Sequence, residues 1–303
     1  MRALKALVKR DMKLFFKDKG MFFTSLITPL VLLVLYGTFL GNIYEDIFLS
    51  ALEAAGAVVP EKLIGGCVSG ELSSSLLAVC CVTVAFCSNM LMVQDKVSGA
   101  RRDLTISPVS GSTLALGYYL SATAATLLIC YAATAICLVY IGLSGWYLTA
   151  GDVLRLVLDV FLLVLFGTAL SSIVNHFLSS QGQISAVGTI VSAGYGFVCG
   201  AYMPISQFSD GLQKVISLLP GTYGTSLLRN HVLRGVFEEM GEQGFPPEVV
   251  EAIKDSVDCN LYFFGDQVSL GAMYLILGIA VLVLIAVYVL LNVLGGKGTR
   301  AKG

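Results

Sequence analysis

Six apolar stretches of about 20 residues each restrict the folds open to this sequence more than any other feature. Of the 303 residues, 56% are hydrophobic and 13% are charged, whereas soluble domains carry about 25% charged residues. Apolar runs of this length need a bilayer as solvent, and a helix satisfies its own backbone hydrogen bonds there. We therefore expect an all-α membrane protein in which residues 1–303 form one transmembrane domain. The six predicted transmembrane helices cover residues 22–41, 70–93, 113–142, 153–175, 184–203 and 270–294.

The distribution of Lys and Arg predicts how these helices are oriented. The first 19 residues hold seven Lys or Arg and two acids, and the last nine hold three Lys or Arg and no acid. With the N-terminus inside, the inner segments carry thirteen basic residues and the outer loops carry five, which satisfies the positive-inside rule. An even number of spans places both termini in the cytoplasm. We expect a multi-pass protein of the plasma membrane of a bacterium.

Residues 3–19, which precede the first span, have the pattern of an amphipathic helix. Apolar side chains recur at helical spacing, and Lys5, Lys9, Lys13 and Lys17 form a ridge on the other side. Asp11 interrupts the apolar face. A helix of this kind lies along the lipid interface, with its Lys side chains directed toward the headgroups.

Two polar segments between the spans are candidates for function. Residues 94–112 form a short, charged cytoplasmic segment, which is either a solvated turn or a helix that docks a soluble partner. The segment 204–268 is long and mostly polar, and its apolar patch at 212–219 is too short to cross a membrane. We expect short re-entrant helices there, followed by a hydrophilic extracellular cap at 238–258.

The sequence offers no catalytic or metal-binding constellation. His176 and His231 are far apart and fall on opposite sides of the predicted membrane. The run GGKGT at 295–299 lacks the spacing of a phosphate loop and follows a membrane span, so we expect no ATPase activity and no bound cofactor or metal. Most cysteines lie in apolar runs, but Cys67 and Cys259 fall in predicted outer loops, either as a disulfide or as two free thiols.

Three stretches together resemble the ABC-2 type permeases, the membrane subunits of drug, antibiotic and polysaccharide exporters. The first is the amphipathic helix ending at 16–18 (FKD), followed by a span with a central Pro29. The second is Asp95 with Gly99 four residues later, before the Ser-Pro pair at 107–108. The third runs from 200–205 (GAYMPI) through 218–223 (LLPGTY) to 227–229 (LLR). Their order and spacing cover essentially the whole chain.

The resemblance implies an exporter subunit that moves an amphipathic substrate outward, such as a drug, an antibiotic, a lipid-linked molecule or a peptide. A separate ATPase subunit would bind ATP and Mg²⁺, and a second permease copy or a paralogue would face this chain across the membrane. Membrane lipid is the other expected contact, and no nucleic acid is expected. The competing interpretations are an ATP-independent carrier or channel, which would show inverted repeats and midplane charges, and a membrane-embedded enzyme.

The resemblance also assigns roles to particular segments. Residues 3–19 become a connecting helix, 95–106 a coupling helix that contacts the ATPase, and 205–222 the outer gate. The residues assigned to coupling are Asp95, Lys96, Gly99, Arg101, Arg102, Asp103 and Pro108. Those of the connecting helix are Lys9, Lys13, Lys17 and Asp18, and those of the outer gate are Pro204, Leu218, Leu219 and Pro220.

Small residues recur every four positions in the fifth predicted span, at Gly188, Ser192, Gly196 and Gly200. Such a row lets two helices approach closely, which suits a dimer interface or a translocation wall. Glycine is also common in membrane helices for no such reason. Gly196→Leu, which we expect to block export without loss of expression, separates the two interpretations.

Three acidic or basic residues near the outer ends of spans need partners. Arg155 and Asp159 are four residues apart in the fourth span, which predicts a buried charge pair that Asp152 can join. A structural pair and a functional one are both compatible with this spacing. Glu71, at the outer edge of the second span, either reaches the headgroups or lines the exit path.

Overall fold

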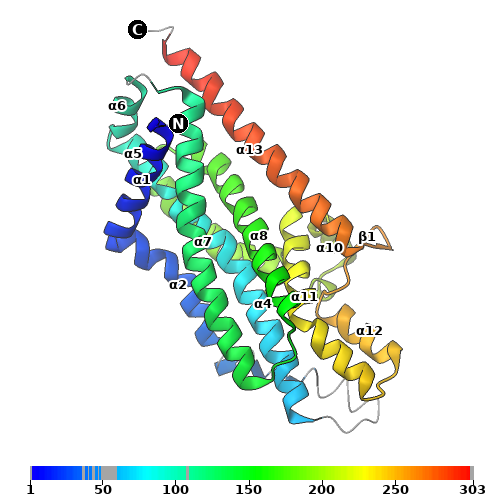
Figure 1. Ribbon diagram of the computed structural model, residues 1–303. Helices are drawn as coiled ribbons and strands as arrows, with labels where there is room; N and C mark the ends of the chain where they lie inside the picture. Colours follow the sequence, from blue (N-terminus) through cyan, green and yellow to red (C-terminus); the bar gives the residue numbers. More distant parts are fainter. Residues whose placement is uncertain are drawn as a thin grey trace.

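The computed structural model describes residues 2–35, 38, 39, 41, 42, 45, 46, 48, 60–106 and 109–300, and these form a bundle of helices (Figure 1). The helices are α1 (Arg2–Lys17), α2 (Lys19–Leu35), α4 (Glu61–Ser88), α5 (Met90–Val97), α6 (Ala100–Ile106), α7 (Gly111–Ser144), α8 (Ala150–Phe177), α9 (Gln181–Val198), the 3₁₀ turn η2 (Ile205–Gln207), α10 (Asp210–Ile216), α11 (Pro220–Glu242), α12 (Pro247–Ser256) and α13 (Leu270–Arg300).

One small hairpin departs from the predicted all-α fold. Strands β1 (Tyr262–Phe263) and β2 (Asp266–Gln267) pair antiparallel just before α13. Gly265, at φ +102°, and Phe264, at φ +51°, form the turn between them. Glycine adopts this left-handed backbone at no steric cost, which permits so tight a connection.

Fewer helices qualify as membrane spans than the six predicted. Within the described residues, four helical stretches are long and apolar enough to cross a membrane: 61–97, 111–144, 150–177 and 270–294. A fifth is possible if α1 and α2, which bend by 75° at their junction, count as one broken span. Helix α9, the predicted fifth span, has 18 residues and carries Gln181 and Gln183, and it is not among these stretches.

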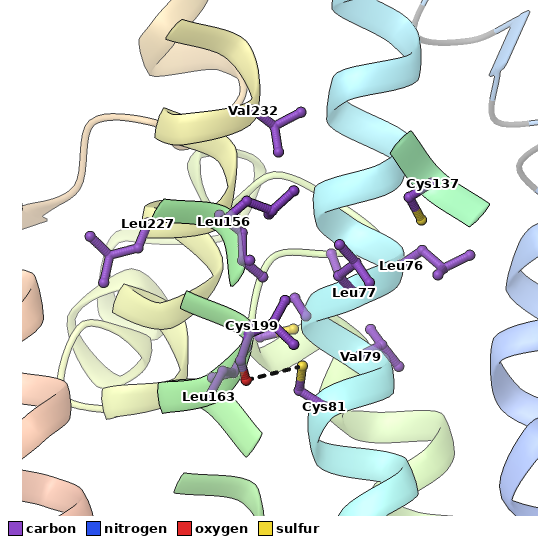
Figure 2. Close-up of a cluster of buried hydrophobic side chains, with 14 of the residues drawn as sticks. Leu76, Leu77, Val79, Cys81, Cys137, Leu156, Leu163, Cys199, Leu227 and Val232 are labelled. Atoms are coloured by element: carbon purple, nitrogen blue, oxygen red, sulfur yellow. Dashed lines mark hydrogen bonds between the residues drawn. The ribbon is translucent and has the colours of Figure 1, made fainter. Parts of the chain in front are cut away.

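Helix α4 is the centre of the bundle. In the span at 61–97, which contains α4, 94% of the most apolar 18-residue stretch is buried. In the span of α13 the corresponding share is 17%. Helices α2, α7, α8, α9 and α11 all pack against α4. The core of the bundle forms where α4 meets α8 and α11, with Leu77, Leu163 and Leu227 wholly buried (Figure 2). The amphipathic pattern is therefore weak in α4, because protein surrounds it on every side.

Close approaches between backbones need glycine at two contacts. A Cβ on Gly167 of α8 would lie 2.8 Å from the carbonyl oxygen of Cys81 in α4. A Cβ on Gly235 of α11 would lie 1.9 Å from the carbonyl oxygen of Tyr147, in the turn between α7 and α8. Neither position has room for a side chain, so these glycines set the spacing of α4, α8 and α11.

Helix α1 has the predicted amphipathic character, and its apolar side packs on protein. Leu7 and Phe15 are buried, and Leu7 lies against Gly117 of α7. The Lys ridge on its other side is exposed. The helix ends at Lys17, and the Asp18 carboxylate accepts a hydrogen bond from the backbone N–H of Met21 at 3.0 Å, which caps α2.

Several boundaries differ from the prediction. The central helix begins at Glu61, nine residues before the predicted start of the second span. The fifth predicted span ends at Val198, and a turn follows it. Most of α11 is buried against α4, α8 and α13, although the segment 204–268 was predicted to be largely polar and outside. Sequence alone missed this because α11 carries charges whose partners lie on other helices.

The bundle has two distinct ends (Figure 1). The terminal end holds α5, α6, the start of α1 and the end of α13. The cap end holds α12 and the turn between α7 and α8. These two names are used below.

Candidate functional site

The segment from Met90 to Ile106 forms two short helices at the terminal end. Helix α5 continues the direction of the central span, and α6 follows after Ser98 and Gly99. Gly99 has φ +83°, and a Cβ there would meet nothing within 4 Å. Its role is therefore conformational: a left-handed residue ends α5 and lets α6 start in a new direction.

A group of hydrogen bonds and ion pairs joins α5 to α1 and α7. Asp95 is buried and accepts two hydrogen bonds from the Arg10 guanidinium, at 2.7 and 2.9 Å. The Tyr118 hydroxyl donates a third at 2.6 Å. Arg10 also pairs with Asp11 at 2.8 Å, and Ser121 of α7 donates to Asp11. The apolar face of α1 packs against α7, where Ser121 donates to Asp11. This contact explains why an acidic residue lies on that face.

Two further side chains tie the segment to α8 and α13. The Lys96 ammonium donates to the carbonyl oxygens of Asn175 at 3.0 Å and Leu178 at 2.9 Å, and also to that of His176. These carbonyls lie at the C-terminal end of α8, where a cation is favourable, so Lys96 caps that helix. Arg101 donates to Asn292 of α13 at 3.0 Å.

The predicted coupling residues therefore divide into two groups. Asp95 and Lys96 make contacts within this chain, to α1, α7 and the end of α8. Arg102 and Asp103 of α6 are exposed. Arg101 lies between the two groups, and Pro108 is outside the described residues. Sequence reasoning missed Arg10 and Tyr118. The one signal that pointed to them was the charge of Asp11 on the apolar face of α1.

A groove of about 1410 Å³ runs between α2 and α9. Its walls are mostly apolar, including Ile27 and Val31 of α2. Its polar lining includes Gln94 of α5, Gln181 and Ser185 of α9. The groove therefore connects the neighbourhood of α5 with the turn that follows α9. Its size and mixed lining suit a drug-sized amphipathic molecule or a packed helix.

The predicted small-residue row does not form one face. Gly188 and Ser192 line the groove. A Cβ on Gly196 would lie 2.3 Å from the ring of Tyr202, so Gly196→Leu would disrupt the turn and is no clean test of transport. Gly200 has φ +75° and follows the end of α9 as a left-handed cap. The spacing of four residues was regular, but the helix ends before the row does.

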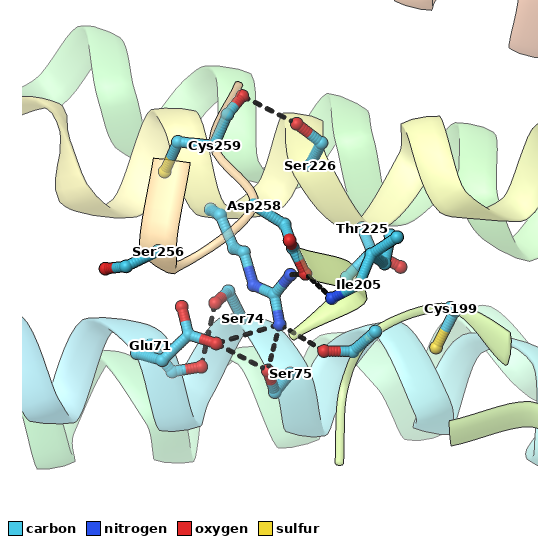
Figure 3. A network of polar contacts seen from close by, with 12 residues as sticks. Glu71, Ser74, Ser75, Cys199, Ile205, Thr225, Ser226, Ser256, Asp258 and Cys259 are labelled. Atoms are coloured by element: carbon cyan, nitrogen blue, oxygen red, sulfur yellow. Dashed lines mark hydrogen bonds and ion pairs between the residues drawn. The ribbon is translucent and has the colours of Figure 1, made fainter. Parts of the chain in front are cut away.

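A buried charge network joins α4, α11 and the segment after α12 (Figure 3). The Arg229 guanidinium is 1% exposed and lies 2.8 Å from the Glu71 carboxylate and 3.2 Å from that of Asp258. It also donates to the Gly200 carbonyl at 2.6 Å and to Ser75 at 3.1 Å. Glu71 does not reach the headgroups, as one interpretation of the sequence had it.

The network fixes the turn between α9 and η2. Asp258 accepts a hydrogen bond from the backbone N–H of Ile205 at 2.8 Å, next to Pro204 of the predicted gate. Burial raises the pKa of Asp258, and Arg229 opposes that effect. One guanidinium between two carboxylates holds three chain segments together, because separating them would leave buried charges unpaired.

The other predicted gate residues surround the α10–α11 turn. Leu218 and Leu219 are 60% and 38% exposed, and Pro220 begins α11. The Tyr223 hydroxyl donates to the Ser217 carbonyl at 2.6 Å, which holds α10 against the start of α11. The turn thus presents two leucines on an otherwise anchored pair of helices.

The predicted pair of Arg155 and Asp159 has different partners. Arg155 contacts Asp152 at 3.4 Å. Asp159 is buried, and it hydrogen-bonds His231 at 2.6 Å and the Tyr274 hydroxyl at 2.5 Å. Periodicity identified a neighbour on the same helix, but the closer partners come from α11 and α13.

Asp152 has a second role in addition to its contact with Arg155. It completes the capping box of α8 with Thr149, and Arg234 of α11 binds it through two nitrogen atoms. The hydrogen bond to Asp152 raises the pKa of Arg234, which stays cationic. Cap and ion pair together fix the start of α8 against α11.

The cysteines are free in this structure. Cys67 lies within α4, not in a loop, and Cys259 is buried beside Ser226. No group of three or more His, Cys, Asp or Glu side chains in the described part of the chain is placed to hold a metal ion. The polar groups described above make contacts within the chain, and they do not converge on a reacting atom.

Long apolar helices around a buried central span define a multi-pass membrane protein. A comparison with protein families identifies the protein more closely than the fold does. Residues 2–233 match the family described as ABC-2 type transporter. The chain therefore belongs to the ABC-2 type transporter family, as its membrane permease domain, which lacks ATPase activity. ABC-2 permeases generally pair with an ATPase subunit. The comparison with curated proteins gave no match.

Proposed function

We propose that this chain is one of two permease halves of an exporter that moves an amphipathic substrate outward, driven by ATP that a separate subunit hydrolyses. In this proposal the terminal end is cytoplasmic, both termini lie inside, and α1–α2 and α9 complete a set of six spans. The thirteen Lys and Arg of the predicted inner segments support that orientation.

The contacts of α5 and α6 carry the proposal. Three charged side chains link this segment to α1, α8 and α13. Arg102 and Asp103 stay exposed for a partner. A soluble subunit that pushes on α6 would therefore move three membrane helices together, since packed helices shift as rigid bodies. In this proposal that partner binds ATP and Mg²⁺.

The groove between α2 and α9 is the proposed translocation path, with a second permease copy or a paralogue as its other wall. Its apolar walls suit an amphipathic substrate better than an ion. Its far end adjoins Tyr202 and Pro204, which line it next to the proposed gate. The Arg229 network would set the position of that gate by holding the Gly200–Ile205 turn.

The first experiment is co-purification from native membranes with ATPase activity measured on the complex. We expect an ATPase subunit to elute with the permease, and the charge reversals Arg102→Glu and Asp103→Lys to remove it. Lys62→Glu makes the same kind of change at an exposed site of the cap end and should leave the complex intact. A permease that purifies alone and still transports would support an ATP-independent carrier or channel.

A further inference from the structure

A second cavity lies on the opposite side of α4 from the groove, between α8, α11 and α13. Its volume is about 760 Å³. Three basic side chains line it, Arg155, Arg234 and Lys254, with one acid, Glu238. Apolar and aromatic groups complete its wall, including Leu158, Phe237, Leu270 and Tyr274. No role assigned above to this chain uses this cavity.

The charge on the cavity wall is unequally neutralised. Arg234 is occupied by Asp152 and Glu238. Lys254 pairs with Glu251 at 2.7 Å, and this hydrogen bond lowers the pKa of Glu251, but an ammonium has three protons to donate. Arg155 is 52% exposed, and its closest acid is Asp152 at 3.4 Å. Arg155 and Lys254 thus have donors to offer an anion.

The position of the cavity relative to the membrane follows from α13. The apolar span of this helix runs from Leu270 to Leu294, and Leu270 itself lines the cavity. The cavity therefore lies at the depth where a bilayer changes from acyl chains to headgroups. The hairpin that begins with β1 lies next to the start of α13 (Figure 1). Its residues Tyr262, Phe263 and Phe264 are exposed. Exposed aromatic residues are typical of membrane interfaces, which supports this depth for the cavity.

The rim of the cavity continues into a lipid-facing surface. Leu154 and Leu158 of α8 are 74% and 47% exposed. Leu270 and Leu275 of α13 are 40% and 61% exposed. An occupant therefore meets basic donors inside and an apolar surface outside. Inorganic phosphate would fill only a small part of 760 Å³ and would leave the apolar rim uncovered.

We propose that this cavity binds the headgroup of an anionic phospholipid from the leaflet at the cap end, with the lipid phosphate on Arg155 and Lys254. The acyl chains would lie along the leucines of α8 and α13. His231, whose Nδ1 is held by Asp159, lines the same cavity. Such a lipid would bridge α8, α12 and α13 beside the buried Arg229 network.

The test is native mass spectrometry of the purified permease with added phosphatidylglycerol or phosphatidylcholine. We expect phosphatidylglycerol to bind the wild type more tightly, and the double variant Arg155→Gln/Lys254→Gln to lose about tenfold in affinity, since each lost charge-assisted contact weakens binding. Lys62→Gln/Lys214→Gln removes two exposed cations outside the cavity and is the matched control. It should bind phosphatidylglycerol like the wild type.

Four results would overturn the proposal. Three are equal binding of the two lipids by the wild type, an undiminished affinity in the cavity variant, and an equal loss in the control variant. The fourth is displacement of the lipid by free phosphate. Inorganic phosphate is added in competition: displacement at concentrations similar to those of the lipid would assign the cavity to free phosphate. The single variants Arg155→Gln and Lys254→Gln are measured beside the double variant, with melting temperatures, so that a loss of binding is read on folded protein.

Discussion

At the scale of single residues, the structure is decided by charges that the bundle encloses. Glu71 and Asp152 are fully buried, and Arg229 and Asp159 are 1% exposed. Each of them contacts an oppositely charged or hydrogen-bonding group from another helix. Taking such groups out of water is costly, so each contact is a condition for the packing around it rather than a large gain in stability.

Arg229→Met should destabilise the protein strongly. The change leaves Glu71 and Asp258 as two buried carboxylates without their cation, at a cost of about 3–5 kcal/mol, or ~10 °C in melting temperature. All eight cysteines are free, and seven of them are buried, so a thiol-reactive dye reports unfolding directly. Lys214→Met, at an exposed site, is the control. Equal melting curves for the two variants would argue against the network.

Gly235→Ala and Gly241→Ala should act in opposite directions on the same helix. A methyl group at Gly235 would collide with the Tyr147 carbonyl at 1.9 Å, which costs about 1–3 kcal/mol by overpacking. At Gly241 nothing lies within 4 Å, and alanine favours a helix by up to ~1 kcal/mol. The dye assay compares them. A stable Gly235→Ala protein would mean that α11 sits farther from the α7–α8 turn.

At the scale of elements, α1 and α5 act as one unit. Their joint consists of Arg10, Asp95 and Asp11, with Tyr118 of α7 beneath it. Lys96 extends the unit to the end of α8. The ion pair therefore links α1 directly to α5, which the amphipathic pattern of residues 3–19 did not imply.

A double-mutant cycle on Arg10→Gln and Asp95→Asn should show this joint. Asp95→Asn keeps the side-chain size, and Arg10→Gln leaves a shorter, uncharged polar side chain. Each removes the bidentate ion pair. We expect the two effects on stability to be non-additive, with a coupling energy of about 0.5–3 kcal/mol. Denaturant unfolding of the four proteins measures it. Lys9→Gln with Asp95→Asn is the control cycle and should be additive, because Lys9 is exposed.

At the scale of the molecule, α4 separates two unlike sides. One side carries the groove between α2 and α9, and the other carries α8, α11 and the exposed helix α13. The exposed leucines and valines of α13 suit lipid. The groove, with its small and polar residues, suits a second permease copy.

Cysteine crosslinking should distinguish these two sides. In a Cys87→Ser background, which removes the cysteine that lines the groove, Ser192→Cys should form a crosslinked dimer in native membranes. Leu282 of α13 is 70% exposed, and the Leu282→Cys protein should remain monomeric under the same oxidant. If the Leu282→Cys protein forms the crosslinked dimer instead, α13 faces the second permease copy and the groove faces lipid, which is the reverse of the proposed arrangement.

The apolar runs of the sequence were enough to predict a helical membrane protein, because a chain of span-length apolar runs crosses a bilayer as helices. A local pattern also located α1, because helical periodicity depends on residues close in the chain. The predicted coupling helix 95–106 is divided at Gly99 into the end of α5 and α6, a break that was not predicted. The order of these local signals was enough to indicate the ABC-2 type family.

Which charges pair with one another depends on how the helices pack. Arg10 and Asp95 are 85 residues apart along the chain, and Ser75 and Arg229 are 154 residues apart. No local pattern carries that information. For the same reason Asp159 was assigned to Arg155 on its own helix, although His231 and Tyr274 lie closer in space. Helix α11 was read as an outer segment because its charges look solvated until the helices that neutralise them are in place.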